Sequence, residues 1–280
     1  MAPTPQAGLY IVATPIGNLG DITLRALKTL AAADAVAAED TRHTGRLLAH
    51  FEIDATLVRY DEHGAAHQRP KLLARLDAGE SVALVSDAGT PLISDPGYRL
   101  VEEARAAGHA VHVVPGPSAP VAALSVSGLP TDAFLFAGFL PTKSAARRSR
   151  IGELAAVKAT LVFFEAPHRV GAALADLAEV LGPREGAVAR ELTKRFETVE
   201  RGTLAALAAR FGEGETKGEI VLLIGPPGEE AGTLDEADID ALLVAALAKM
   251  PASAAAGDVA KATGLNRREL YRRALALKET

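Results

Sequence analysis

The first half of the chain alternates short apolar runs with stretches whose apolar residues recur at helical spacing. The runs predicted to be buried strands are residues 9–13, 35–38, 57–60, 82–85 and 110–114. After the fourth run, Leu100, Val101 and Ala104 fall on one side of a predicted helix. Strands that alternate with helices favour a largely parallel sheet, so this half is predicted to be an α/β domain.

The pattern changes after residue 128, where Gly128-Leu129-Pro130 indicates a boundary. Further strands are predicted at 134–139, 160–164, 196–201 and 219–224, and a helix at 170–181. Because fewer helices separate these strands, a mixed or antiparallel sheet is expected. A linker is predicted at 226–230. The predicted domains are residues 1–128, 129–228 and 229–280.

The last part of the chain is predicted to be helical. The helices are expected at 239–249, 253–263 and 267–277. Gly264 separates the last two, Asn266 can cap the third, and Glu269 occupies its third position, which is typical of a helix-turn-helix. Residues 249–280 hold seven Lys or Arg against three Asp or Glu, a charge pattern that indicates a nucleic-acid contact. An ordinary solvated helix face is the alternative.

Gly, Pro and polar residues gather in the loops that follow the predicted strands. Asp87 and Asp95 lie in the loop after the fourth strand, where Gly89 and Gly97 can take positive φ. Such loops, at the carboxyl ends of parallel strands, are where open α/β sheets bind ligands. Asp, Gly and Pro are also ordinary turn residues, so a purely structural loop is the alternative. Two residues are predicted to cap the helices that follow other strands, Asp21 and Ser118.

Two further strand ends carry ionisable side chains. The second strand runs into Glu39-Asp40-Thr41-Arg42-His43, and the third runs into Asp61-Glu62-His63. These are more polar groups than a turn requires, and they are candidates for acid–base chemistry. The alternative is a solvated loop with an internal Asp–Arg pair.

Composition excludes several classes of protein. The chain has no cysteine, so disulfides, thiol nucleophiles and cysteine metal sites are excluded. Its net charge is −5. No His–Asp cluster has metal-ligand spacing, so no metal is expected. The loop after the first strand matches neither the dinucleotide nor the phosphate-binding glycine motif. No signal-peptide pattern and no run of membrane-spanning length is seen, so a soluble, cytoplasmic protein is expected.

Five segments, in order, resemble the small-subunit rRNA methyltransferase I family of the tetrapyrrole-methylase-like superfamily. The segments are Ala13-Thr14-Pro15-Ile16-Gly17-Asn18-Leu19-Gly20-Asp21, Ala38-Glu39-Asp40-Thr41-Arg42, residues 86–91 with 94–97, Pro115-Gly116-Pro117-Ser118-Ala119 and Glu165-Ala166-Pro167-His168-Arg169. Superfamily members that act on tetrapyrroles usually begin with a Gly-x-Gly-Pro-Gly loop. This chain has Pro15-Ile16-Gly17-Asn18-Leu19 instead, which favours the rRNA branch.

The resemblance implies a fold and an activity. The fold is two α/β domains of tetrapyrrole-methylase type, the first mainly parallel and the second mixed, followed by a helix-turn-helix-like module. The activity is 2′-O-methylation of a cytidine in the decoding region of 16S rRNA, with S-adenosylmethionine as the methyl donor. The partners would be 16S rRNA or the 30S subunit, and a second copy of the chain in a homodimer. The alternatives are a tetrapyrrole or protein side-chain methylase of the same superfamily, and a non-catalytic RNA-binding protein.

The resemblance also implies which residues contact the donor, in a cleft between the two domains. They are Thr14, Pro15, Ser86, Asp87, Ala88, Gly89, Thr90, Pro91, Pro115, Gly116, Pro117 and Ser118, with Phe164, Ala166, Leu192 and Gly218 from the second domain.

Two further sets of residues are hypotheses from the chemistry. A ribose hydroxyl must lose its proton, and the candidate bases are Glu39 first, then Asp40 and Asp61, with Glu165 weaker. Arg42 or His168 would orient the acceptor. The predicted phosphate contacts are Lys143, Arg147, Arg148, Arg150, Arg267, Arg268, Arg272 and Arg273.

Overall fold

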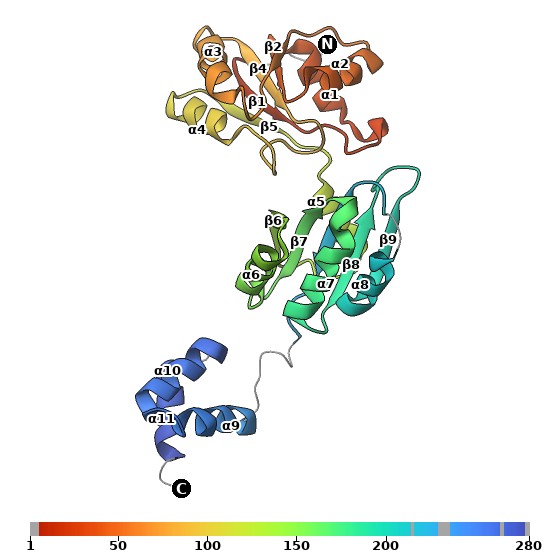
Figure 1. The fold of residues 1–280 in the computed structure, drawn as a ribbon. Coiled ribbons are helices and arrows are strands. Elements are labelled where there is room, and N and C mark those ends of the chain that lie inside the picture. The colour runs from red at the N-terminus through yellow and green to blue at the C-terminus, as the bar shows by residue number, and fades with distance from the viewer. Residues whose placement is uncertain (1–5, 214–215, 229–235, 264–265, 278–280) are drawn as a thin grey trace. The chain divides into compact units, whose positions relative to one another are not determined.

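The computed structural model describes residues 6–213, 216–228, 236–263 and 266–277. Within these ranges the chain separates into two compact units, residues 1–226 and 227–280. The first unit holds two five-stranded sheets, and the second holds helices only (Figure 1). The domain boundaries expected from the sequence stay predictions.

The first sheet is parallel throughout, as its alternation with helices predicts. Its strands are β1 (Gly8–Val12), β2 (Ala35–Ala38), β3 (Leu57–Arg59), β4 (Ser81–Val85) and β5 (Val111–Val114), in the order β3-β2-β4-β1-β5. Its helices are α1 (Leu24–Ala32), α2 (Thr41–His50), α3 (Ala65–Asp77) and α4 (Tyr98–Ala106). In β4, Val82 and Leu84 pack into one core and Ala83 and Val85 into the core on the opposite face. Both faces are therefore covered, which explains the uninterrupted apolar run.

The second sheet is mixed, as expected. Its strands are β6 (Phe134–Phe139), β7 (Thr160–Glu165), β8 (Glu185–Arg190), β9 (Thr198–Thr203) and β10 (Ile220–Ile224), in the order β6-β7-β10-β8-β9. The pair β6–β7 is parallel and the other pairs are antiparallel. Three helices pack on one face: α6 (Ser144–Leu154), α7 (Val170–Leu181) and α8 (Leu204–Gly212). A short 3₁₀ helix, η2 (Pro167–Arg169), precedes α7.

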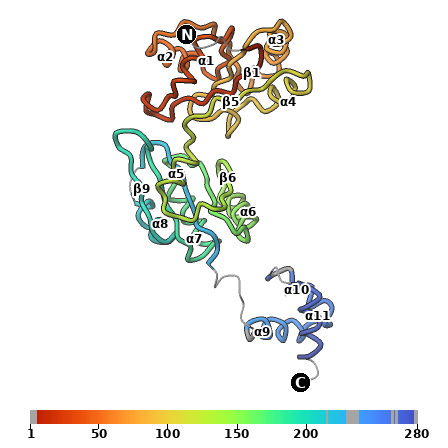
Figure 2. Tube along the Cα trace, turned by 180° about the vertical axis from the view of Figure 1, so that it is seen from behind, coloured from red at the N-terminus to blue at the C-terminus, as the bar shows by residue number. Residues whose placement is uncertain are grey.

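The opposite face of the second sheet is covered by α5 (Ala119–Ser127). Ala123 and Leu124 of this helix pack with Val162 of β7 and Val221 of β10. Ile16, from the loop after β1, joins the same core. Figures 1 and 2 both show α5 with the second sheet, although it precedes the predicted boundary at residue 128.

Several local predictions were wrong. Asp21 ends a 3₁₀ turn, η1 (Leu19–Asp21), and the cap of α1 is Thr23, whose Oγ accepts a hydrogen bond from the Ala26 N–H. Ser118 stands at the N-cap of α5 but makes no capping bond through its side chain. The segment after Glu39, for which a solvated loop was the alternative, is the start of α2, which the Asp40 side chain caps by accepting from the Arg42 N–H.

The second unit contains α9 (Glu236–Leu247), α10 (Ala252–Thr263) and α11 (Arg267–Ala276) around a small core. The predicted cap Asn266 is confirmed, since its Oδ1 accepts from the Arg268 N–H at 2.9 Å. The predicted turn residue Gly264 lies outside the described residues. No helix in the described ranges is long and apolar enough to cross a membrane.

Candidate functional site

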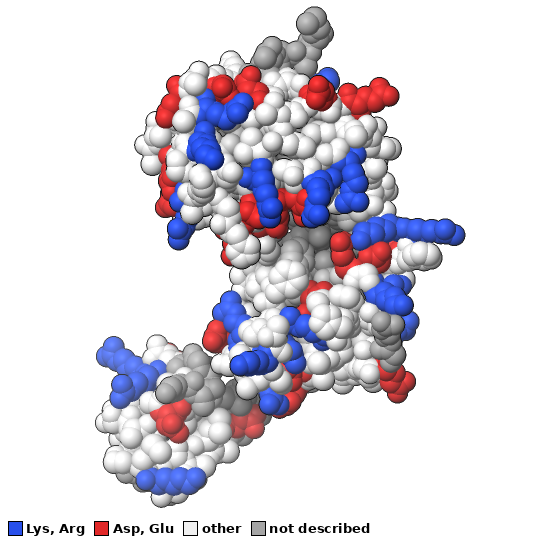
Figure 3. Space-filling view, turned by 45° about the horizontal axis from the view of Figure 1, so that its top comes forward, with Lys and Arg blue, Asp and Glu red and all other residues white. Residues whose placement is uncertain are grey.

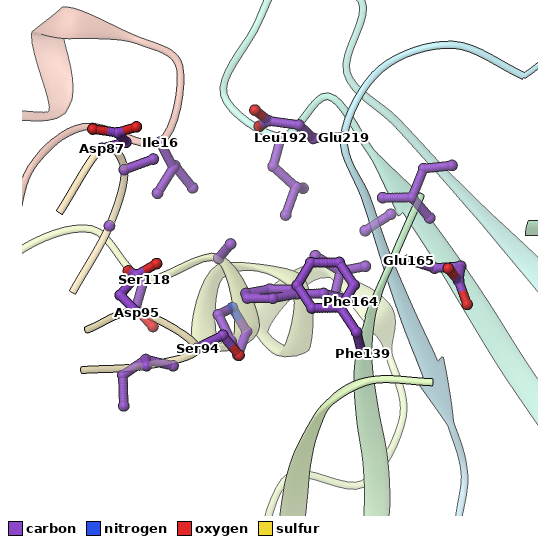
Figure 4. Close-up of a pocket in the computed structure, with 18 of the residues that line it drawn as sticks. Ile16, Asp87, Ser94, Asp95, Ser118, Phe139, Phe164, Glu165, Leu192 and Glu219 are labelled. Atoms are coloured by element: carbon purple, nitrogen blue, oxygen red, sulfur yellow. The ribbon is translucent and has the colours of Figure 1, made fainter. Parts of the chain in front are cut away.

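In the first unit, a cavity of about 450 Å³ lies between the segments that follow the strands of the first sheet and residues of the second sheet and its loops. We call it the central cavity (Figure 4). It is lined by Ile16, Glu39, Asp87, Ala88, Gly89, Thr90, Ile93, Ser94, Asp95, Ser118, Ala119, Pro120, Phe139, Phe164, Glu165, Ala166, Pro167, Ala189, Leu192, Gly218, Glu219, Ile220 and Val221. Its size falls within the range of ligand pockets, roughly 300–1,000 Å³.

The wall on the side of the first sheet is built from loops that are tied together. Thr14 and Gly89 exchange two backbone hydrogen bonds, of 2.9 and 3.1 Å. The Oγ of Thr90 donates to the Pro117 carbonyl at 3.1 Å, which joins the loop after β4 to the loop after β5. Gly89 has φ +78°, and a Cβ there would lie 3.3 Å from Ile16. The loops after β1, β4 and β5 therefore form one connected wall.

The wall on the side of the second sheet is mainly apolar. Phe164 and Leu192 point toward the cavity in Figure 4, and Ala166 and Gly218 complete this side. Leu192 lies between Glu191 and Thr193, which both take positive φ, at 52° and 64°. Non-glycine residues seldom adopt this backbone conformation, and it holds Leu192 in place at the cavity.

Five acidic residues line the central cavity, and three of them, Glu39, Asp87 and Asp95, lie on the side of the first sheet. The Asp87 Oδ1 accepts a hydrogen bond from the Asp40 N–H at 3.0 Å. Burial, together with nearby Asp95 and Asp87, raises the pKa of Glu39, and burial together with Asp87 raises the pKa of Asp95. A carboxylate whose pKa is raised toward neutral is a stronger base when it is ionised.

Asp40 and Asp61 line a second, polar hollow of about 640 Å³ beside the central cavity. Asp40 accepts two hydrogen bonds from the Arg42 guanidinium, at 3.1 and 2.8 Å, which hold its pKa well below the usual range. The Gly64 N–H, and then Arg59, lower the pKa of Asp61. The Asp–Arg pair considered as the alternative reading is therefore present. Both carboxylates are occupied, which makes Glu39 the stronger candidate base.

Glu165 and His168 are less suited to their predicted roles. The Glu165 side chain is buried and points away from the central cavity in Figure 4. Burial raises its pKa, and its Oε1 lies 3.1 Å from the Arg169 Nε. His168 is exposed and lines neither the central cavity nor the polar hollow.

The predicted donor contacts fall into three sets. Those that line the central cavity are Asp87, Ala88, Gly89, Thr90, Ser118, Phe164, Ala166, Leu192 and Gly218. Thr14 and Pro15 line a neighbouring hollow that also includes Asp87 and Ala88. Five others support the loops without lining the central cavity, namely Ser86, Pro91, Pro115, Gly116 and Pro117. The donor role of each residue stays a prediction.

Twelve of the lining residues were not among the predicted site residues, and they include Ile93, Ser94 and Phe139. Ser94 takes φ +65°, which no residue pattern indicated. Phe139 was recognised as a strand residue, but its orientation depends on a bulge in β6 that strand alternation does not predict.

Arg147 was wrongly predicted as an RNA contact. Its side chain is only 4 % exposed, and its Nε donates to the Asp176 Oδ2 at 2.6 Å. Because helical spacing turns Arg147 inward with Ile151 and Leu154, it cannot reach a phosphate from the surface. Its role here is structural.

The other basic residues predicted to contact RNA differ in their ion pairing and in their exposure. Arg148 pairs with Glu179 and Arg150 with Glu153, and Arg273 pairs with Asp240 of α9 at 2.5 Å. The exposed members of the set are Lys143, Arg148, Arg150, Arg267, Arg268 and Arg272. On the face drawn in Figure 3, basic and acidic side chains are interspersed, in agreement with such pairs. In the described part of the chain, no group of His, Asp and Glu side chains could hold a metal ion.

Comparison with known proteins identifies the class of protein to which this fold belongs. Residues 8–208 match the family Tetrapyrrole (Corrin/Porphyrin) Methylases, and residues 233–278 match the RsmI C-terminal HTH domain. The crystal structure of uroporphyrin-III-C-methyltransferase from Thermus thermophilus is 27 % identical, with a TM-score of 0.56 over 78 % of this chain and 94 % of that one. The two sheets and the cavity between their residues are thus those of a tetrapyrrole-methylase fold.

Closer relatives give the family. The ribosomal RNA small subunit methyltransferase I of Mesorhizobium japonicum is 56 % identical over 98 % of this chain and 94 % of the relative. The protein of the same name from Escherichia coli O157:H7 is 47 % identical over 98 % of this chain and 96 % of the relative. The chain belongs to the ribosomal RNA small subunit methyltransferase I family.

Proposed function

We propose that the protein transfers a methyl group from S-adenosylmethionine to the ribose 2′-oxygen of a cytidine in the decoding region of 16S rRNA. The observation that carries this is the central cavity, in a chain that shares about half its residues with the rRNA methyltransferases along nearly its whole length. The alternative activities considered from the sequence, of a tetrapyrrole or protein methylase or of a non-catalytic RNA-binding protein, are not the activity for which this family is named.

The residues present fit the donor. The cavity joins an apolar wall, with Phe164 and Leu192, to a wall bearing Glu39, Asp87 and Asp95. Apolar side chains suit an adenine ring, and carboxylates suit a ligand that carries positive charge. The donor supplies a methyl group on a positively charged sulfur, which is already electrophilic.

The protein has two tasks in this reaction. The first is to hold the acceptor oxygen in line with the methyl group, since positioning supplies much of the acceleration in such a displacement. The second is to accept the hydroxyl proton, which falls to the carboxylate of Glu39. With the donor bound, its methyl group would pass to the acceptor oxygen and the electron pair of the broken bond would remain on sulfur, while Glu39 would hold the proton that the hydroxyl loses.

The direct test uses radiolabelled donor. The protein is incubated with 30S subunits and, separately, with naked 16S rRNA, and the labelled nucleotide is mapped. We expect label on the 2′-oxygen of a single cytidine. Label on a base, on a protein or on neither RNA substrate would contradict the proposal.

The proposal includes an RNA-binding role for the helical unit. Arg267, Arg268 and Arg272 of α11 are exposed, and the charge of this region is opposite in sign to that of the chain as a whole. Each phosphate contact adds to affinity in a salt-dependent way. The same proposal includes the homodimer implied by the resemblance, which analytical ultracentrifugation tests, and a cytoplasmic location.

A chain that ends at residue 228 is expected to bind S-adenosylmethionine as the full chain does. Its affinity for rRNA is expected to fall about tenfold or more, because several phosphate contacts are lost. Calorimetry measures the first quantity and filter binding the second. The full-length triple variant Arg267→Ala, Arg268→Ala, Arg272→Ala is the matched control, and it should reproduce most of the loss. Unchanged RNA affinity in both would remove the role assigned to α11.

A further inference from the structure

Phe139 presents an exposed aromatic ring at the central cavity. The residue is 58 % exposed although it is aromatic, and it lines the cavity. Its ring centroid lies 5.5 Å from that of Phe164, which in turn lies 4.8 Å from that of Phe136. Figure 4 shows the Phe139 and Phe164 rings next to each other at the cavity. The two inner rings are partly buried against the core, whereas the outermost ring is exposed and open to a ligand.

A bulge in β6 directs this ring to the cavity. Leu135 and Ala137 pack toward α6–α8, and Phe136 packs on the opposite face. Strict alternation would place Phe139 with Leu135 and Ala137. Instead the register shifts, so that Phe136 pairs with Val162 and Phe139 pairs with Phe164, and Gly138 takes φ +67°. Bulges beside active sites commonly redirect a side chain in this way.

The backbone that follows Phe139 is fixed by two arginines. The Arg169 Nη2 donates to the Leu140 carbonyl at 2.5 Å. The Arg147 Nη1 donates to the Thr142 carbonyl at 3.2 Å, while Asp176 holds the same guanidinium. The ring is therefore presented by a segment with little freedom, and that segment loses little further conformational entropy when a ligand binds.

A basic side chain follows on the same segment. Lys143 is exposed and stands four residues after Phe139, at the start of α6. An aromatic ring together with a cation is the combination with which proteins hold an unpaired nucleotide, the ring stacking on the base and the cation contacting a phosphate.

We propose that Phe139 stacks on the base of the acceptor nucleotide and that Lys143 contacts the adjoining phosphate; this rests on the proposed function. The cavity needs a second occupant besides the donor, because the acceptor sugar has to reach it. Phe164 lies on the inner, core side of the aromatic pair and Phe139 on the solvent side. The outer ring is therefore the one that an RNA strand meets as it enters.

The test compares Phe139→Ala, Phe139→Tyr and Phe134→Ala in the full-length protein. The substrate is the rRNA or 30S subunit that the unaltered protein methylates. Loss of one base–aromatic stack is expected to raise KM for RNA in Phe139→Ala about tenfold. The Kd for S-adenosylmethionine, from calorimetry, stays within twofold. Phe139→Tyr is expected to keep KM for RNA near the value of the unaltered protein, because it keeps an aromatic ring. Phe134, also exposed but at the other end of β6, is the matched control and leaves both values unchanged.

Other outcomes overturn the proposal. A raised Kd for the donor with unchanged KM for RNA would mean that the ring holds the adenine. An unchanged Kd for the donor together with an unchanged KM for RNA would mean that the ring contacts neither the donor nor the RNA. If Phe139→Ala does not fold, Phe139→Leu keeps the apolar bulk without the aromatic face, and a KM for RNA at the unaltered value would overturn the stack. If the unaltered protein methylates no RNA, it is the proposed function that fails.

Discussion

Glu39→Gln is expected to lower kcat for methyl transfer by about 10²- to 10⁴-fold, the usual contribution of a general base. The amide keeps the size of the side chain but cannot accept the hydroxyl proton. The Kd for S-adenosylmethionine should change far less than kcat, since the apolar wall is untouched and Asp87 and Asp95 keep two of the three carboxylates on the opposite wall. Single-turnover assays with saturating donor and RNA measure the rate. Full turnover in the variant would exclude Glu39 as the base.

The pH profile gives an independent check. Glu39 must be ionised to act, so the rate falls as pH drops through its pKa. Burial and the neighbouring Asp95 and Asp87 raise that pKa, so the acidic limb should lie above the ordinary glutamate value of about 4.3. Glu39→Gln should lose this limb. Glu62→Gln is the matched control, because Glu62 is an exposed carboxylate on the polar hollow, and it should keep the limb.

Asp176→Leu is expected to lower the free energy of unfolding by about 3–5 kcal/mol. The substitution leaves the Arg147 guanidinium buried without its carboxylate partner, and it also removes the acceptor of the Ser144 hydroxyl. Urea unfolding measures the loss. The double variant Arg147→Met with Asp176→Leu replaces both charges by apolar side chains and should recover much of it. Equal losses in the single and double variants would show that the unpaired charge is not the cause.

The architecture could be predicted from the sequence because buried strands leave a simple pattern. The continuous apolar run of β4 and the alternation of strands with helices are both visible in the chain, and the parallel sheet follows. The helix α2 was missed because its first residues are polar. Thr41, Arg42 and His43 resemble a loop until Asp40 is recognised as the cap of the helix.

The site could be predicted in part. The loops at strand ends were identified, since Gly, Pro and Asp at those positions are visible in one sequence. Charge was a weaker guide. Arg147 and Arg148 are adjacent and chemically alike, yet one is buried against Asp176 and the other is exposed with Glu179. That difference depends on which side of α6 faces the core. The position of Phe139 at the cavity could not be predicted, because a one-residue shift in register reverses the face on which a strand residue lies.

The paired backbone bonds between Thr14 and Gly89 have a consequence for motion. Neither loop can swing outward alone, because opening one exposes the amides of both. Deuterium uptake at these two amides should therefore proceed at a common rate, and whatever frees the loop after β1 also loosens the loop after β4. We therefore expect the two segments, 75 positions apart in the chain, to move together as one unit.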